Sequence, residues 1–486
     1  MHHQRPARTT PSRRWGPPLA AVTTTALLGT LLTAAPATAT PAPTRGLPGT
    51  GSLSALATAR PATVERAQEQ FLARTPAALR DQELAWAPCT AQEVAPAEVD
   101  ALLECSRVLV PRDWHDPAAG EPLEIAVSRL SREGDRPART IVTNPGGPGG
   151  AGLSMGVLGL QPALAGTEVI GLDVRGTGAS TTLTCGRDAL TAMSAAPDVR
   201  DRSPEALAAA AAAMAATADA CADDPLVDVV TTEQTVHDID LVRDALDRDT
   251  VDWVGYSGGT WLGAQYATYF PGRVGRFVLD SAVDVGSAFQ TVFSEDQPMA
   301  FQRRFEQDYA PYAAQHAWLY HLGGTPAEVV ATYERLRAAY AGAPLGLPGL
   351  GLGVDGRIVD TLVVQAMYSK ARFEQLSWIL LALQVVDRLR STGDAAAVER
   401  AAADLTVRLH ALAPQLADPQ VPALASMNAT FLATTCNDTA WSQGQEFWDA
   451  LGERQGSRYP LAGWSKTQQP CGYWDRPALK IGRAHV

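Results

Sequence analysis

A serine between two glycines is the feature of this sequence best suited to carry out chemistry. The stretch Gly255–Gly259 (GYSGG) follows the apolar run 251–254 and precedes an amphipathic stretch at 260–267. A serine on a sharp turn between a strand and a helix presents its hydroxyl to solvent, and only small neighbours fit around such a turn. A chain with 41 glycines contains this pattern by chance in roughly one case in six, so the strand and helix on either side carry the prediction. They indicate that Ser257 is a nucleophile for acyl transfer.

A second glycine-rich stretch, Asn144–Gly152 (NPGGPGGAG), follows the short apolar run 140–143. Without side chains, glycines let backbone N–H groups approach a ligand closely. We therefore expect the N–H groups of Gly147 and Gly258 to form an oxyanion hole beside Ser257. A flexible surface loop is the alternative. A phosphate-binding loop is disfavoured, because no Gly-Lys-Ser/Thr follows and no acidic ribose partner is evident.

The elements that must position these stretches alternate along the chain. Strand patterns occur at 123–127, 140–143, 169–173, 251–257 and 277–280, and helical patterns occur at 203–219 and 232–246. This alternation predicts an α/β fold with a mostly parallel sheet and helices on both faces. From 286 to 430 the strand signal fades and helical patterns with Gly/Pro breaks take over, which we interpret as an inserted helical cap.

The composition is that of a globular protein, with 46% hydrophobic and 19% charged residues. The net charge is −12. A surface of that sign repels phosphate backbones and anionic lipids, so nucleic acid is excluded as an expected partner.

The N-terminal 39 residues have the three regions of a secretory signal peptide. Arginines precede the apolar stretch 19–32, and Ala37-Thr38-Ala39 resembles a cleavage site. A membrane anchor is the alternative, but the apolar stretch is short for a bilayer. Ser12-Arg13-Arg14 leaves twin-arginine export open. We expect a secreted protein without a membrane partner after cleavage, with residues 40–80 as a flexible linker or pro-segment.

Six cysteines in an exported chain predict disulfides. The pairing that closes the shortest loops joins Cys89 with Cys105, Cys185 with Cys221, and Cys436 with Cys471. No Cys-x-x-Cys pair or neighbouring histidine supports a metal site, so we expect no metal.

Together these motifs resemble the secreted tripeptidyl aminopeptidase and prolyl aminopeptidase group of α/β-hydrolases. Asn144–Gly149 resembles the family's His-Gly-Gly-Pro-Gly loop, with Pro145 in place of the histidine, and Gly255–Gly259 resembles its nucleophile turn. Asp173–Ser180 resembles its Asp-x-Arg-Gly-x-Gly-x-Ser segment.

Near the end of the sequence, Thr435–Asp438 and Pro470–Trp474 resemble the start of the C-terminal region of the tripeptidyl branch. The resemblance covers residues 80–479. It implies an α/β-hydrolase core at 81–285, a cap at 286–430 and the start of a C-terminal region at 431–479.

The implied activity is that of a serine exopeptidase that releases short peptides, tripeptides in particular, from peptide N-termini without a cofactor. Ser257 attacks the scissile carbonyl, a histidine takes its proton and an acid orients the histidine. An esterase or lipase acting on small acyl esters, and an inactive protein that only binds, remain alternatives. Peptides are the expected partners and a monomer the expected state.

The base and the acid of this triad are not evident, because both should follow Ser257 on later strands. We expect structural roles for His115, His237, His316, His321 and His410. Residues 480–486 resemble a translated sequencing adapter, so His485 is expected to be an artefact. We expect roughly 50 to 90 further natural residues and an unpaired sheet edge where the last strands are missing, so that the 486-residue chain is expected to be inactive and poorly folded.

An aminopeptidase also needs a carboxylate to pair with the substrate's ammonium group. Candidates are Asp438, beside Cys436, and Glu295 or Asp296, near the start of the cap. The alternative is that each is a solvated surface acid.

Overall fold

The computed structural model describes residues 73–94, 99, 101–130, 137, 139–186, 196–347, 353–412 and 422–478. The chain divides into two units, Met1–Thr50 and Gly51–Val486, and all described residues belong to the second. The expected signal peptide (1–39), most of the expected linker and the expected tail (480–486) lie outside the described residues. The end of that linker, residues 73–80, contains helix α2 (Ala77–Arg80).

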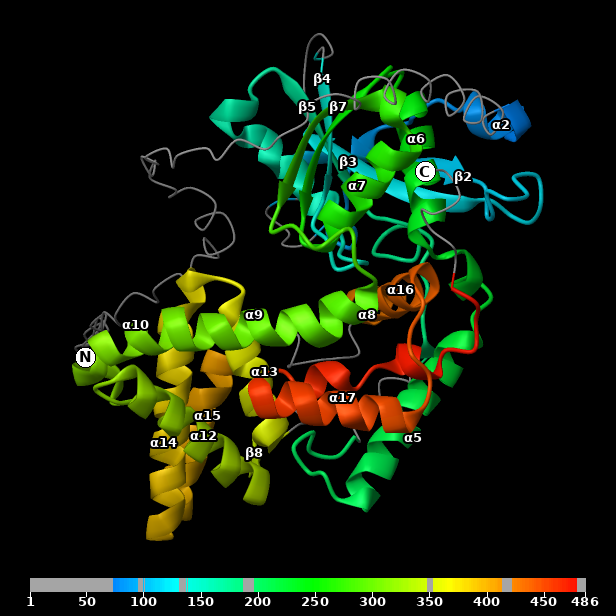
Figure 1. The fold of residues 1–486 in the computed structure, drawn as a ribbon. Helices are drawn as coiled ribbons and strands as arrows, with labels where there is room; N and C mark the ends of the chain where they lie inside the picture. Colours follow the sequence, from blue (N-terminus) through cyan, green and yellow to red (C-terminus); the bar gives the residue numbers. More distant parts are fainter. Residues whose placement is uncertain are drawn as a thin grey trace, which may run out of the picture. The chain divides into compact units, whose positions relative to one another are not determined.

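A seven-stranded sheet positions the candidate site (Figure 1), with the strand order β1-β2-β3-β5-β4-β6-β7. Its strands are Ala87–Pro88 (β1), Leu103–Val110 (β2), Leu123–Leu130 (β3), Arg139–Asn144 (β4), Thr167–Leu172 (β5), Val251–Tyr256 (β6) and Val274–Asp280 (β7). The strands β1 to β3 pair antiparallel, and β3 pairs antiparallel with β5, whereas β5, β4, β6 and β7 are parallel. Burial of β4 and β5 explains their apolar and β-branched sequences. The expected strands and the mostly parallel sheet are confirmed.

The order strand, turn, helix, strand around Ser257 is also confirmed. β6 leads through Ser257 into α7 (Gly258–Tyr269), which is followed by β7. Helix α6 (Thr232–Ala245) precedes β6 and is capped by the Thr231 hydroxyl, which accepts from the Gln234 N–H. The expected apolar face of α6, Val236, Ile239 and Val242, is fully buried.

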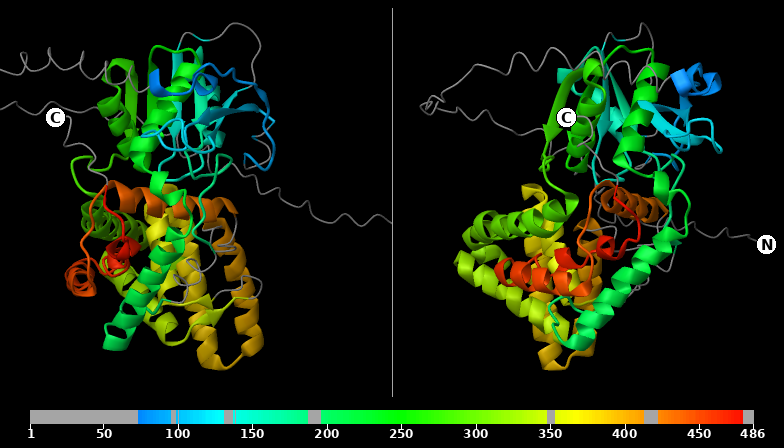
Figure 2. Two further views of the ribbon diagram at one scale, coloured as in Figure 1. Left: turned by 90° about the vertical axis from the view of Figure 1, so that its right-hand side faces the viewer. Right: turned by 45° about the vertical axis from the view of Figure 1, so that its right-hand side comes forward.

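Helix α5 (Pro204–Ala222) matches the expected alanine-rich helix and is capped by Ser203. It runs beside α17 (Gln445–Arg458) rather than along the sheet (Figures 1 and 2). Among the described residues, α5 is long and apolar enough to span a bilayer by length and composition alone, which was not expected from the sequence. Its buried Met214 and Cys221 indicate a helix packed within the protein.

The cap is helical, as expected, and has its own buried cluster, which includes Phe305, Leu336, Leu376 and Leu405. Its elements are α8 (Phe289–Thr291), the π-helix η6 (Val292–Asp296), α9 (Gln297–Arg304), the π-helix η7 (Phe305–Tyr309), α10 (Ala310–Gln315), α11 (Ala317–Tyr320), α12 (Pro326–Gly342), β8 (Leu345–Gly346), β9 (Gly353–Val354), α13 (Gly356–Met367), η8 (Lys370–Arg372), α14 (Phe373–Thr392) and α15 (Ala395–Leu412).

Helix α16 (Pro422–Asp438) belongs to the core of the sheet rather than to the cap. Its Ala429, Leu432 and Cys436 are buried in the same apolar cluster as the strands. The expected boundary between 430 and 431 therefore falls inside one helix. Within the described residues 431–478 there are helices and turns but no strand, the later ones being α17, η10 (Ser465–Thr467) and η11 (Pro470–Tyr473).

Candidate active site

Ser257 lies where the nucleophile prediction requires it, on the turn between β6 and α7. Its backbone has φ 51° and ψ −120°, a conformation that non-glycine residues rarely adopt. The turn is held by the Ser257 N–H, which donates to the Asp280 carbonyl at 3.0 Å, and by Thr260, whose N–H donates to the Ser257 carbonyl at 2.9 Å. Ser257 is exposed, although its neighbours Gly258 to Thr260 are buried. A strained backbone thus presents one hydroxyl to solvent.

The flanking glycines are required by close backbone packing. A Cβ on Gly255 would lie 2.3 Å from the Gly259 carbonyl oxygen, and a Cβ on Gly259 would lie 2.6 Å from the Asn144 carbonyl oxygen. The buried Trp253 donates from Nε1 to the Gly259 carbonyl at 3.1 Å. The Gly-x-Ser-x-Gly spacing therefore reflects the space available around the turn.

The glycine-rich stretch Asn144–Gly152, called the glycine tract below, lies directly against this turn. A Cβ on Gly146 would be 2.8 Å from the Gly258 nitrogen, and a Cβ on Gly258 would be 2.9 Å from the Gly147 carbonyl carbon. Gly146, Gly147 and Gly149 have φ of 96°, 116° and 86°, which favour glycine. The structure thus brings Ser257, Gly258 and Gly147 together. Their role as an oxyanion hole stays a prediction.

Two of the described histidines lie around the start of α6. His237 is buried among Trp114, Tyr269 and Phe270, and its Nδ1 is 2.8 Å from the Glu233 carbonyl. Burial lowers the pKa of His237 to about 4, so its ring is neutral at pH 7. The Nε2 of His115 lies 3.5 Å from a carboxylate oxygen of Glu233.

The other two described histidines belong to the cap. His316 places Nδ1 2.7 Å from the Tyr312 carbonyl. His321 ends α11 in the left-handed conformation, with φ 53°. Among the side chains that the structure describes, no histidine forms a hydrogen bond with Ser257. The side chain of His410, and all of His485, lie outside the described residues.

Asp438, the first candidate for binding the substrate amine, is only 1% exposed. Its Oδ1 accepts from the Thr232 N–H at 3.0 Å and its Oδ2 from the Thr232 hydroxyl at 2.5 Å. Burial raises the pKa of Asp438 to about 7. The carboxylate therefore caps the first turn of α6, and it has no exposed surface from which to bind a substrate amine. The sequence could not indicate this burial, because Thr232 is 206 residues away.

The other two candidate carboxylates lie in the π-helix η6 at the start of the cap. Glu295 is exposed. The pKa of its neighbour Asp296 is raised by partial burial and by the nearby charge of Asp284. Both face a different environment from Asp438, because neither is enclosed by the core.

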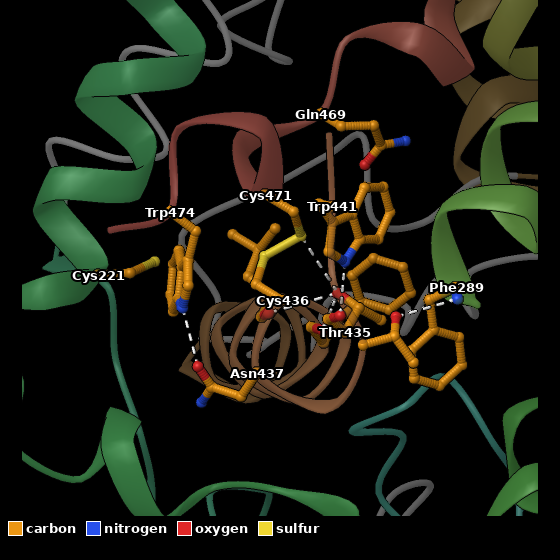
Figure 3. Close-up of a disulfide and its surroundings, with 12 residues drawn as sticks. Cys221, Phe289, Thr435, Cys436, Asn437, Trp441, Gln469, Cys471 and Trp474 are labelled. Atoms are coloured by element: carbon orange, nitrogen blue, oxygen red, sulfur yellow. Dashed lines mark hydrogen bonds between the residues drawn. A yellow bond between two sulfur atoms is a disulfide. The ribbon is translucent and has the colours of Figure 1, made fainter. Parts of the chain in front are cut away.

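The two C-terminal motifs meet in space at the disulfide between Cys436 and Cys471 (Figure 3). Trp474 donates from Nε1 to the Asn437 side chain at 2.8 Å, and Trp441 donates from Nε1 to the Thr435 carbonyl at 2.8 Å. The expected pairings Cys89–Cys105 and Cys185–Cys221 are confirmed as well. Within the described residues, no group of three or more His, Cys, Asp or Glu side chains is placed to hold a metal ion.

The motif that follows β5 is almost completely buried. Arg175 is 0% exposed and forms a bidentate ion pair with Asp238, with distances of 2.7 Å and 2.6 Å. Asp173 is also 0% exposed and binds backbone N–H groups at the end of the glycine tract. Neither residue was expected from the sequence to have a role in the site.

Comparisons with known proteins agree with the α/β fold described above. The family described as alpha/beta hydrolase fold matches residues 139–336. Tripeptidyl aminopeptidases of Streptomyces lividans and Streptomyces coelicolor are each 29% identical to this chain over 409 residues, which are 80% of this chain and 70% and 69% of those proteins. The serine protease Hip1 of Mycobacterium tuberculosis is 31% identical over 264 residues, 52% of this chain and 49% of that protein.

Proposed function

The chain is an α/β-hydrolase of the group that includes the tripeptidyl aminopeptidases, and from this relation we propose that it is a serine exopeptidase acting through an acyl-enzyme on Ser257. Its substrates are peptides with a free N-terminus, from which it releases short peptides, in particular tripeptides. The observation that carries the proposal is the exposed Ser257 on its strained turn, with Gly147 and Gly258 in contact beside it.

In this proposal the Ser257 hydroxyl attacks the scissile carbonyl and loses its proton to a base. The carbonyl oxygen becomes negative and accepts hydrogen bonds from the N–H groups of Gly147 and Gly258. The leaving amine takes the proton, and water then hydrolyses the ester on Ser257.

The base is not one of the four described histidines in this proposal. His237 is enclosed by aromatic rings, and His316 binds a carbonyl within the cap. We therefore propose that the 486-residue chain turns substrate over slowly, because a serine nucleophile without its base loses most of its rate.

An exposed carboxylate of the cap, Glu295, is the proposed partner of the substrate ammonium group. Asp438 is unsuited to this role because its carboxylate is buried and bonded to Thr232. Glu295 is free of the core and lies within η6, the segment through which the chain enters the cap.

Three disulfides support the proposal that the protein is secreted, since disulfides persist in oxidising compartments. In this proposal the signal peptide is cleaved and the released protein acts as a monomer on extracellular peptides.

A labelling experiment with a matched serine control tests the nucleophile. A fluorophosphonate probe, with imidazole added as a soluble base, should label the wild-type chain and the Ser281→Ala variant but not Ser257→Ala. Ser281 is a suitable control because it is also exposed and has a positive φ of 58°. Labelling that survives Ser257→Ala, or that is absent from the wild type, contradicts the proposal.

Substrate class is tested by comparing a tripeptide amide with its N-acetylated form and with a p-nitrophenyl ester under the same conditions. Acetylation should lower kcat/KM by at least about tenfold, because it removes the charge that the cap carboxylate pairs with. Equal rates on the two peptides, with faster ester hydrolysis, would instead support an esterase.

A further inference from the structure

The mechanism leaves Asp173, the first residue of the motif after β5, without a role. Asp173 follows the last residue of β5, and its side chain is completely buried. Within the part of the chain that the structure describes, it forms no ion pair. A buried carboxylate without a cation is costly unless hydrogen bonds satisfy its oxygens, so its bonds show what it stabilises.

Asp173 binds the end of the glycine tract through its first carboxylate oxygen. Oδ1 accepts from the Gly152 N–H at 2.6 Å and from the Leu153 N–H at 3.2 Å. Oδ2 accepts from the Ala179 N–H at 2.8 Å. One side chain thus joins the tract to the turn that follows β5.

The surroundings of Asp173 leave little room for another arrangement. A Cβ on Gly178 would lie 2.1 Å from Asp173 Oδ2, so only glycine fits beside the carboxylate. The Ser180 hydroxyl donates to the Asp173 carbonyl at 2.6 Å. A Cβ on Gly152 would lie 2.2 Å from the Leu172 carbonyl oxygen, so the tract is pressed against the end of β5.

The other end of the tract is fixed by Asn144. Its Oδ1 accepts from the Gly146 N–H at 2.9 Å, and the Gly150 N–H closes the turn by donating to the Gly146 carbonyl at 2.8 Å. Helix α16 covers the middle, since a Cβ on Gly149 would lie 2.8 Å from the Met427 carbonyl oxygen. The position of Gly147 next to Gly258 therefore depends on supports at both ends of the tract.

From this arrangement we infer that Asp173 is a positioning residue for the oxyanion hole: by binding Gly152 and Leu153 it holds Gly147 beside Gly258. The inference rests on the proposed function. Asp173 acts through the backbone of the tract and touches neither Ser257 nor substrate.

The test compares Asp173→Asn with Asp360→Asn by hydrogen exchange. Asparagine keeps the size of the side chain, but its NH₂ group cannot accept from an N–H. Asp360 is a similarly buried carboxylate, 5% exposed, that binds Arg337 and Tyr333 in the cap. We expect exchange of the amides at 146–153 to rise at least about tenfold in Asp173→Asn, while Asp360→Asn leaves these amides as in the wild type.

Reactivity provides the second measurement. Once the folded fraction is accounted for, phosphonylation of Ser257 should slow about 10- to 100-fold in Asp173→Asn with little change in probe affinity, because a displaced donor acts on the transition state. If Asp173→Asn does not fold, Ser180→Ala removes the bond to the Asp173 carbonyl, together with the bond that the Ser180 hydroxyl accepts from the Ala126 N–H, and should give a smaller increase at the same amides.

Unchanged exchange at 146–153, or an equal rise throughout the chain, would overturn the inference. The two hypotheses fail separately. A wild-type chain that the probe does not label contradicts the proposed function, whereas hydrogen exchange still decides whether Asp173 holds the tract.

Discussion

The two sides of Ser257 differ in how completely the chain builds them. On one side the glycine tract is fixed by Asn144 and Asp173 and covered by α16. On the other side, β7 pairs with β6 alone among the strands that the structure describes, and its Val278 and Leu279 are 54% and 39% exposed. Apolar side chains on a parallel strand are normally covered.

This difference separates two functions of a serine hydrolase. The closed side, where Asn144, Asp173 and α16 hold the glycine tract, would stabilise the oxyanion, which requires rigid backbone donors in a fixed place. The open side, along β7, is where a base would have to approach the Ser257 hydroxyl. None of the histidine side chains that the structure describes forms a hydrogen bond with Ser257. The contacts that hold the glycine tract in place thus involve none of the described histidines.

The largest effect should come from disturbing the closed side at its contact with Ser257. In Gly258→Ala the new Cβ would lie 2.9 Å from the Gly147 carbonyl carbon and push the tract away. We expect the rate of Ser257 phosphonylation to fall about 10²- to 10³-fold, the cost of losing an oxyanion donor. Gly342→Ala is the control, because a Cβ there has no neighbour within 4 Å. Equal rates in the two variants would mean that the tract does not support the reaction.

A smaller effect, on stability, should come from replacing Asp438, the last residue of α16, whose carboxylate binds Thr232. The folded-state pKa of Asp438 is about 7, above its usual value near 3.9. Between about pH 4 and pH 7 the folded state holds a proton that the unfolded state has lost, so this residue lowers stability as pH rises through that window.

Asp438→Asn removes this titration while keeping an acceptor for the Thr232 N–H. Relative to wild type, the variant should therefore gain stability from pH 4 to pH 7, by at most about 4 kcal/mol. His237, with a lowered pKa of about 4, contributes the opposite slope in both proteins. Urea denaturation at several pH values measures the difference, and parallel curves would rule out this role of Asp438.

The smallest effect should be found on the open side. Val278→Thr adds a hydroxyl to a side chain that is already 54% exposed, so the free energy of unfolding should change by less than about 0.5 kcal/mol. The same substitution at Val142, which is fully buried in β4, should cost about 1 to 3 kcal/mol. Thermal unfolding of both variants makes the comparison, and a large loss at Val278 would show that β7 is covered in solution.

Local patterns in the sequence were enough to predict five of the seven strands of the sheet, the turn at Ser257 and the disulfides, whereas β1 and β2 were not predicted. The strand and helix patterns, the Gly-x-Ser-x-Gly spacing and the short loops between cysteines each depend on residues close together in the chain. The placement of Asp438 against Thr232 and of α16 against Gly149 was not predictable in this way. These contacts join segments hundreds of residues apart, and composition alone does not distinguish a buried acid from a solvated one.

Helix α16 also sets an order of events during synthesis. The ribosome releases the Ser257 turn and the glycine tract first and the whole cap next, before the helix that covers the tract emerges. A nascent chain therefore lacks the cover over Gly149 until α16 has left the exit tunnel, because that cover comes from a helix made almost three hundred residues later.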